Sequence, residues 1–143
     1  MFKKHFLITL LLLSVLLASC AQAGQPGSSG ADKAAQVINR EWSLTSLNGQ
    51  APLDGSKVTL KLENGQAGGS AGCNSYGGQY TLQGSQLTFR DLFQTEMACM
   101  EPAGVMEQET AFLQTLSQAA SFQVSGDQLE LKNAAGETIL IFQ

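Results

Sequence analysis

The stretch KVTLKLENG, residues 57–65, predicts the fold more directly than any other part of the chain. Val58, Leu60 and Leu62 alternate with polar residues, which is the period-two pattern of a strand with one buried face. Asn-Gly ends the stretch, and this dipeptide is the strongest short-range signal for a hairpin turn. We therefore expect a sheet built from hairpins, with the chain turning back on itself at this point.

The same alternation appears on both sides of this stretch. Residues 40–47 predict an earlier strand, and further hairpins are predicted around residues 84–85 and 125–128. An apolar strand at 138–142 closes the chain. The glycine-rich segment 65–72 lacks the lysine of a phosphate-binding loop, so we interpret it as a strand with a close backbone approach or a bulge.

One stretch has helical spacing instead. Between Pro102 and Ala119 the apolar residues recur with the period of an amphipathic helix. Pro102 suits the first helical position, and the acidic residues Glu107 and Glu109 suit the N-terminal half, where the helix dipole favours negative charge. The predicted fold is α+β: seven or eight short, mostly antiparallel strands form a curled, partly barrelled sheet that packs on one amphipathic helix.

The N-terminus has the features of a secretion signal. Lys3 and Lys4 precede an apolar run from Phe6 to Leu17, which is too short to span a bilayer. The run continues into Ala-Ser-Cys20, which resembles the bacterial lipobox, whose cysteine receives lipid and becomes the first residue of the mature protein. Residues 1–19 are then a signal peptide, and Cys20 is the lipidation site. The alternative is an ordinary signal-peptide cleavage beside an incidental cysteine.

Residues 20–38 are predicted to connect the lipid to a domain at 39–143. Residues 21–36 contain no aromatic residue and no Leu, Ile, Val or Met, a composition typical of a flexible tether. A short helix near the end of this segment is the alternative. Two or more acyl chains anchor a protein stably, so the membrane itself is a predicted partner. By resemblance to the sorting rule of enteric bacteria, Ala21 favours the outer membrane, facing the periplasm.

Composition excludes several classes of function. The chain has 143 residues and is 43% hydrophobic, which suits one globular domain. Loss of residues 1–19 removes the only histidine and leaves 6 basic and 12 acidic residues, a net charge of −6. The few scattered basic residues exclude nucleic acid as a partner. Without histidine, Ser-His-Asp and Cys-His catalysis and His-ligated zinc are excluded, and we expect no cofactor and no metal.

Carboxylates are the acid–base groups that remain. Glu96, Glu101, Glu107 and Glu109 are close in the sequence, and two carboxylates that converge in a cleft would suit glycoside hydrolysis. Such charges are more typical of a solvated face and a helix N-terminus. We therefore predict that the protein is not an enzyme. The alternative is a carboxylate-dependent enzyme that acts on cell-wall glycans.

Cys73 and Cys99 are the two cysteines of the domain. An oxidising compartment and an even number of cysteines favour a disulfide between them. A buried reduced pair is one alternative. A soft-metal site that adds Met97 and Met100 is another, but two methionines that flank a cysteine are more often core residues.

Several segments of the domain together are specific enough to compare with known families. They are Trp42–Gly49, the run GCNSYGGQY at Gly72–Tyr80, Leu87–Phe89, TEMAC at Thr95–Cys99, and the helical segment Glu109–Leu116. Together they resemble the META domain, also called HslJ-like, of bacterial envelope lipoproteins. The resemblance implies a small α+β, partly barrelled domain that is often lipid-anchored and associated with heat or envelope stress. It implies no defined enzyme activity and no known ligand.

Asn74, Tyr76 and Tyr80 are the candidate binding residues. The glycines around them allow a tight turn, and both tyrosines can lie half-buried with the hydroxyl outward. This loop, facing Thr95–Met100, is either a recognition surface or a turn that serves folding. We predict a lipid-anchored, non-enzymatic envelope protein that aids stress tolerance by binding an unknown envelope protein or ligand. An inhibitor or carrier that acts through the loop around Tyr76 is an alternative.

Overall fold

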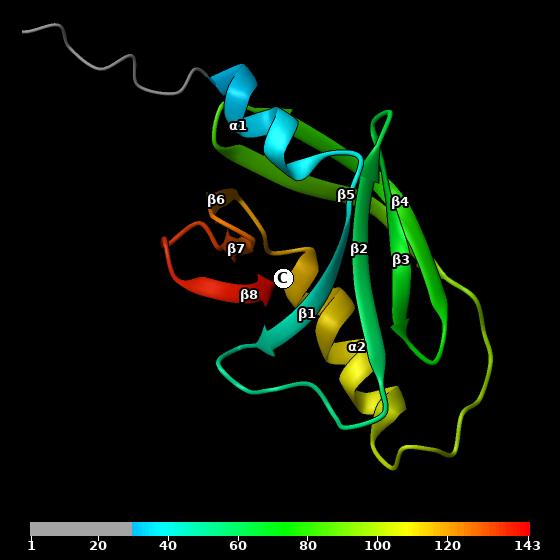
Figure 1. The fold of residues 1–143 in the computed structure, drawn as a ribbon. Helices are drawn as coiled ribbons and strands as arrows, with labels where there is room; N and C mark the ends of the chain where they lie inside the picture. The colour runs from blue at the N-terminus through cyan, green and yellow to red at the C-terminus, as the bar shows by residue number, and fades with distance from the viewer. Residues whose placement is uncertain (1–29) are drawn as a thin grey trace, which may run out of the picture.

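The computed structural model describes residues 30–143, and within them eight antiparallel strands form a closed barrel (Figure 1). Each strand pairs with its neighbours in the sequence, and the last strand pairs with the first. The strands are β1 Glu41–Leu47, β2 Lys57–Glu63, β3 Gln66–Gly72, β4 Ser75–Gln83, β5 Gln86–Gln94, β6 Ser121–Ser125, β7 Gln128–Lys132 and β8 Thr138–Phe142. The helices of this part are α1 Gly30–Val37 and α2 Val105–Leu116. The predicted α+β class is confirmed.

The predicted signal peptide, the predicted lipidation site Cys20 and residues 20–29 of the predicted tether lie outside the described residues. Within residues 30–143, neither helix is long and apolar enough to cross a membrane.

The turn between β2 and β3 follows from its residues. Asn64 and Gly65 have φ values of 50° and 79°, the left-handed conformation that a tight hairpin turn requires. In β3, Gly69 lies so close to Thr59 that an added Cβ would collide with the Thr59 carbonyl oxygen. The prediction of a glycine-rich strand with a close backbone approach is therefore confirmed.

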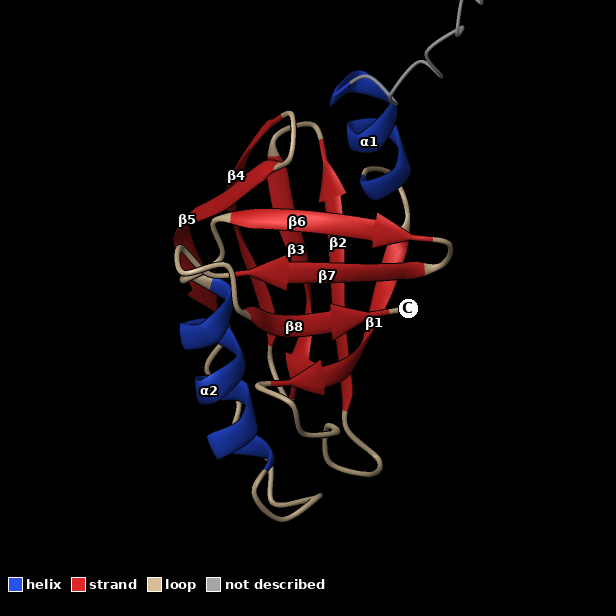
Figure 2. Cartoon of the chain, turned by 90° about the vertical axis from the view of Figure 1, so that its left-hand side faces the viewer, coloured by secondary structure: helices blue, strands red, loops and turns tan. Residues whose placement is uncertain are grey.

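One hydrophobic core fills the barrel and includes the buried face of α2. Every strand contributes buried apolar side chains, among them Trp42, Leu60, Ala71, Tyr76, Phe89, Phe122, Leu131 and Phe142. From α2, the Phe112 ring lies edge-on to Tyr76 with centroids 5.4 Å apart, and edge-on to Phe142 at 6.5 Å. Because one face of α2 completes the core, the helix is held in a defined position against the barrel (Figure 2).

The seam between β5 and β6 is the weakest in the barrel. A single pair of residues, Gln86 and Ser121, is in register there, whereas β4 and β5 are paired along their length. The chain leaves the sheet after β5, forms α2 and returns at β6. α1 packs against β4 and β6, at the end of the barrel opposite the start of α2 (Figure 2).

The structure corrects the predicted tether over its last residues. Residues 30–37 form α1, and the Val37 side chain at its end is fully buried. The Trp42 indole Nε1–H donates a hydrogen bond of 2.9 Å to the Val37 carbonyl. Residues 30–38 therefore belong to the folded domain, which the sequence placed at 39–143. One apolar side chain at the end of an alanine-rich segment was too weak a signal of this packing.

α2 begins later than predicted. Gly104 is the residue before the helix and has a φ of 86°, while the Val105 N–H donates to the Pro102 carbonyl at 3.0 Å in a preceding turn. The placement of Pro102 at the first helical position is therefore wrong. The left-handed conformation, which glycine adopts easily, sets the start of the helix at Val105.

Candidate functional site

A buried polar network joins α2 to the β3–β4 connection. Glu109 of α2 is fully buried. Its Oε2 accepts a hydrogen bond of 2.6 Å from the backbone N–H of Asn74, and its Oε1 accepts one of 2.7 Å from Asn74 Nδ2. The sequence favours a solvated acidic face and helix N-terminus for Glu109, and the structure corrects this: the carboxylate is turned inward and holds Asn74.

Asn74 extends the network to the segment after β5. Its Oδ1 accepts hydrogen bonds from the Thr95 hydroxyl and the Met97 N–H, each at 2.7 Å. Its Nδ2 donates a second bond, of 3.1 Å, to the Met97 carbonyl. Every donor and acceptor position of the amide is thus used. Asn74 therefore couples the position of residues 95–97 to that of Glu109.

The disulfide between Cys73 and Cys99 lies beside this network and is confirmed, with a sequence separation of 26. The Thr95 N–H donates to the Ser75 carbonyl at 3.0 Å, so residues 95–99 run alongside residues 73–75. Residues 30–143 contain no group of three or more His, Cys, Asp or Glu that could hold a metal. The expectation that Met97 and Met100 are core residues is wrong, because both are exposed.

The structure does not present Asn74 and Tyr76 to a partner. Tyr76 is 5% exposed, and its hydroxyl donates a hydrogen bond of 2.8 Å to the Thr59 carbonyl. Burial raises the pKa of this hydroxyl above its ordinary value, so it stays a neutral donor. Tyr80 is half-buried against the core. The expectation of an outward Tyr76 hydroxyl is wrong, and the buried side chains of Asn74 and Tyr76 serve folding.

Three exposed apolar side chains lie at the end of β5 and on the following loop, which this network holds at residues 95–97. Phe93, Met97 and Met100 are 67%, 59% and 85% exposed, and we call them the apolar strip. The Phe93 ring lies over Gly77, where an added Cβ would come within 2.6 Å of it. In Figure 1 the segment after Phe93 is the long yellow-green loop between β5 and α2. Several large apolar side chains exposed within one short stretch of chain indicate a candidate binding surface.

The clustered glutamates do not share an environment in the structure. Glu96, Glu101 and Glu107 are exposed, while Glu109 is held by Asn74. None of the four lines either of the cavities described below. The geometry therefore lends no support to a glycan-cleaving site in this cluster.

A groove that the sequence analysis did not identify lies on β1, β2 and β3. It has a volume of about 450 Å³, and two carboxylates, Glu41 and Glu63, line it together with Lys61. Both carboxylates are in exposed ion pairs: Glu41 lies 3.2 Å from Lys57 Nζ, and Glu63 lies 2.9 Å from Lys61 Nζ. Carboxylates paired in this way are typical of a solvated sheet face.

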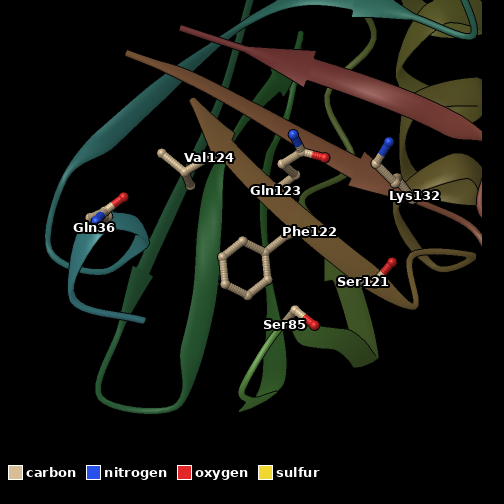
Figure 3. Close-up of a pocket in the computed structure, with 7 residues that line it drawn as sticks. All are labelled: Gln36, Ser85, Ser121, Phe122, Gln123, Val124 and Lys132. Atoms are coloured by element: carbon tan, nitrogen blue, oxygen red, sulfur yellow. The ribbon is translucent and has the colours of Figure 1, made fainter. Parts of the chain in front are cut away.

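A second cavity, of about 460 Å³, lies between α1 and β6 (Figure 3). Its lining residues are Gln36, Ser85, Ser121, Phe122, Gln123, Val124 and Lys132. The Lys132 ammonium is engaged by Glu130 at 3.4 Å and by the Thr138 hydroxyl at 3.2 Å. No carboxylate lines this cavity. The sequence could not indicate it, because Gln36 and the β6 residues come from opposite ends of the domain.

These features define a class of protein: a small antiparallel barrel with an apolar surface segment braced by a disulfide and a buried glutamate. The META domain family model matches residues 35–143, and the chain belongs to this family. An NMR structure of a protein from Burkholderia xenovorans is similar, with 28% identity, a TM-score of 0.60, and coverage of 90% of this chain and 97% of that one. A second NMR structure has 25% identity and a TM-score of 0.60, covering 76% and 92%. No curated protein matches the sequence.

Proposed function

We propose that this META-domain protein is a lipid-anchored, non-enzymatic protein of the bacterial envelope that binds another envelope component through the apolar strip. Through this binding it contributes to tolerance of heat or envelope stress. The observation that carries the proposal is the exposure of Phe93, Met97 and Met100 on a segment that is bonded at several points. Because the segment is already ordered, little conformational entropy is lost when a partner covers it.

The proposed anchor comes from the sequence. Lys3 and Lys4, the apolar run and the lipobox ending at Cys20 follow one another in the order of a lipoprotein signal. The chain between Cys20 and Gly30 can reach at most about 35 Å. The lipid would therefore keep the domain close to a membrane surface, in the proposed location at the periplasmic face of the outer membrane.

The anchor is tested by labelling. We expect cells that express the wild-type protein to incorporate radioactive palmitate into it and to retain it in the membrane fraction. Cys20→Ala removes the thiol that accepts the lipid, so this variant should carry no label and should leave the membrane fraction. If the wild-type protein carries no label, the proposed lipid anchor is wrong. The proposed binding surface has its own test, which this result does not affect.

The binding surface is tested by photo-crosslinking in intact cells. Met100 is 85% exposed, so a photoreactive amino acid can replace it without disturbing the core. We expect an adduct with one discrete envelope component from position 100. The matched control is position 127 in the turn between β6 and β7, where the Asp127 side chain is 94% exposed. Equal adducts from the two positions, or none from position 100, would mean that the apolar strip does not bind in the cell.

A further inference from the structure

The exposed Arg90 precedes a long interval of the chain in which every charged residue is acidic. The sequence has no Lys, Arg or His between Arg90 and Lys132. Asp91, Glu96, Glu101 and Glu107 lie in this interval and are exposed. Glu96 directly precedes Met97, and Glu101 directly follows Met100. Each methionine of the apolar strip therefore has an acidic residue directly beside it in the chain, and we call Glu96 and Glu101 the acidic rim.

Several acids elsewhere on the described surface are paired with a cation, although the exposed Asp54 and Glu137 have no such ion pair. Glu41, Glu63, Asp127 and Glu130 each have a Lys or Arg nitrogen within 4 Å, at 3.2, 2.9, 3.6 and 3.4 Å. Among residues 30–143, none of the acids that flank the strip is in such an ion pair. Their charge is thus left uncompensated by the protein itself, and a partner with positive charge would be favoured in encounter and in orientation.

The side chains of the strip suit an amphipathic partner. Methionine is unbranched and polarizable, so Met97 and Met100 can adapt to apolar side chains of different shapes. Phe93 supplies a larger ring seated over Gly77. The seven residue steps from Phe93 to Met100 span at most about 25 Å, roughly four turns of helix. A helix of that length presents apolar residues at a spacing of three or four along one face.

We propose that the partner of the apolar strip is a basic amphipathic segment. Its apolar side chains contact Phe93, Met97 and Met100, and its Lys or Arg side chains pair with Glu96 and Glu101. This inference rests on the proposed function, since it names the chemistry of the component that the strip binds. Burial of apolar surface supplies the affinity, and the acidic rim selects basic partners over acidic ones and over an anionic lipid surface.

The test uses the mature chain from residue 20 onward with Cys20→Ala, so that no detergent competes for the strip. The probe is a fluorescent peptide of about 14 residues, made of Leu and Lys at helical spacing, and its matched control replaces Lys by Glu. We expect fluorescence anisotropy to show binding of the Lys peptide at least about tenfold tighter than that of the Glu peptide. The preference should weaken when salt is raised from about 50 to about 300 mM.

Variants locate the site. Met97→Gln with Met100→Gln should weaken binding of the Lys peptide about tenfold, because both apolar contacts are replaced by amides. Glu96→Gln with Glu101→Gln should weaken it about threefold and flatten the salt dependence. The matched control, Asp127→Asn with Glu137→Gln, removes the same charge from exposed positions elsewhere and should leave the affinity unchanged. Equal effects of the two charge variants would overturn the inference, because binding would then follow net charge alone.

A lipid partner is the other outcome. If the protein sediments with phosphatidylcholine or phosphatidylglycerol vesicles and Met97→Gln with Met100→Gln abolishes this, the strip inserts into membrane and the inference is wrong. The inference also fails alone if position 100 crosslinks to a discrete protein in cells while the Lys peptide does not bind. Loss of the crosslink itself would instead overturn the proposed function.

Discussion

Glu109→Ala is expected to lower the free energy of unfolding by about 3–5 kcal/mol, because it leaves two buried donors without an acceptor. These donors are the backbone N–H and the Nδ2 of Asn74, which lie 2.6 and 2.7 Å from the carboxylate. The loss should extend to residues 95–97, since the Asn74 amide also holds Thr95 and Met97. Urea unfolding followed by the fluorescence of Trp42, the single tryptophan, measures the effect.

Two further variants separate the network from general effects of charge or helix propensity. Glu107→Ala, two residues earlier on the same helix, removes an exposed carboxylate and should change stability by less than about 0.5 kcal/mol. Glu109→Gln keeps the shape of the side chain, but its NH2 group then faces one of the two Asn74 donors. We therefore expect the free energy of unfolding to fall by an intermediate amount, about 2 kcal/mol. Similar losses for Glu109→Ala and Glu107→Ala would show that the contacts to Asn74 do not stabilise the fold.

The second large effect concerns the disulfide. Cys73→Ser should lower the free energy of unfolding by about 3–4 kcal/mol, because a crosslink across 26 positions restricts the unfolded chain. It should also leave the Cys99 thiol free to react with a maleimide. The same unfolding measurement in urea gives the stability, and mass spectrometry after maleimide labelling gives the number of free thiols.

The controls for this prediction are Cys99→Ser and the double variant. All three variants lack the same single bond, so their stabilities should agree within about 0.5 kcal/mol. A much lower stability of Cys73→Ser than of Cys99→Ser would assign part of the effect to packing around Cys73. Two reactive thiols in wild-type protein isolated from oxidised envelope would show that the bond is absent there.

The strands were predictable because their signals are local. Val58, Leu60 and Leu62 alternate within β2, and Asn64-Gly65 takes the left-handed conformation that the hairpin needs, so neighbouring residues suffice to indicate both features. The start of α2 was less predictable, because Pro102 and Gly104 both mark helix starts. Only the structure distinguishes the two positions, because the hydrogen bond from the Val105 N–H to the Pro102 carbonyl places Pro102 in a turn before the helix.

The sequence predicted which two segments face each other, but not which of their residues are exposed. The sequence analysis placed Asn74 and Tyr76 opposite Thr95–Met100, and hydrogen bonds between Asn74 and residues 95 and 97 join the two segments. For the loop around Tyr76 the sequence left open a recognition surface or a turn that serves folding, and it favoured core positions for the methionines. The structure supports the folding role of this loop, because Tyr76 is buried and packs edge-on against Phe112, whereas Met97 and Met100 are exposed.

Residue order alone determined the hairpins and the amphipathic helix, since each depends on spacing along the chain, whereas the even number of cysteines only favoured the disulfide. Tertiary structure decided that the barrel closes, that α1 joins it through Trp42, and that Glu109 faces inward. The physical reason is that burial is a property of a place in the fold. Glu109 and Asn74 are 35 positions apart in the sequence. No local sequence pattern therefore shows whether the Glu109 carboxylate is bonded to the Asn74 amide or to water.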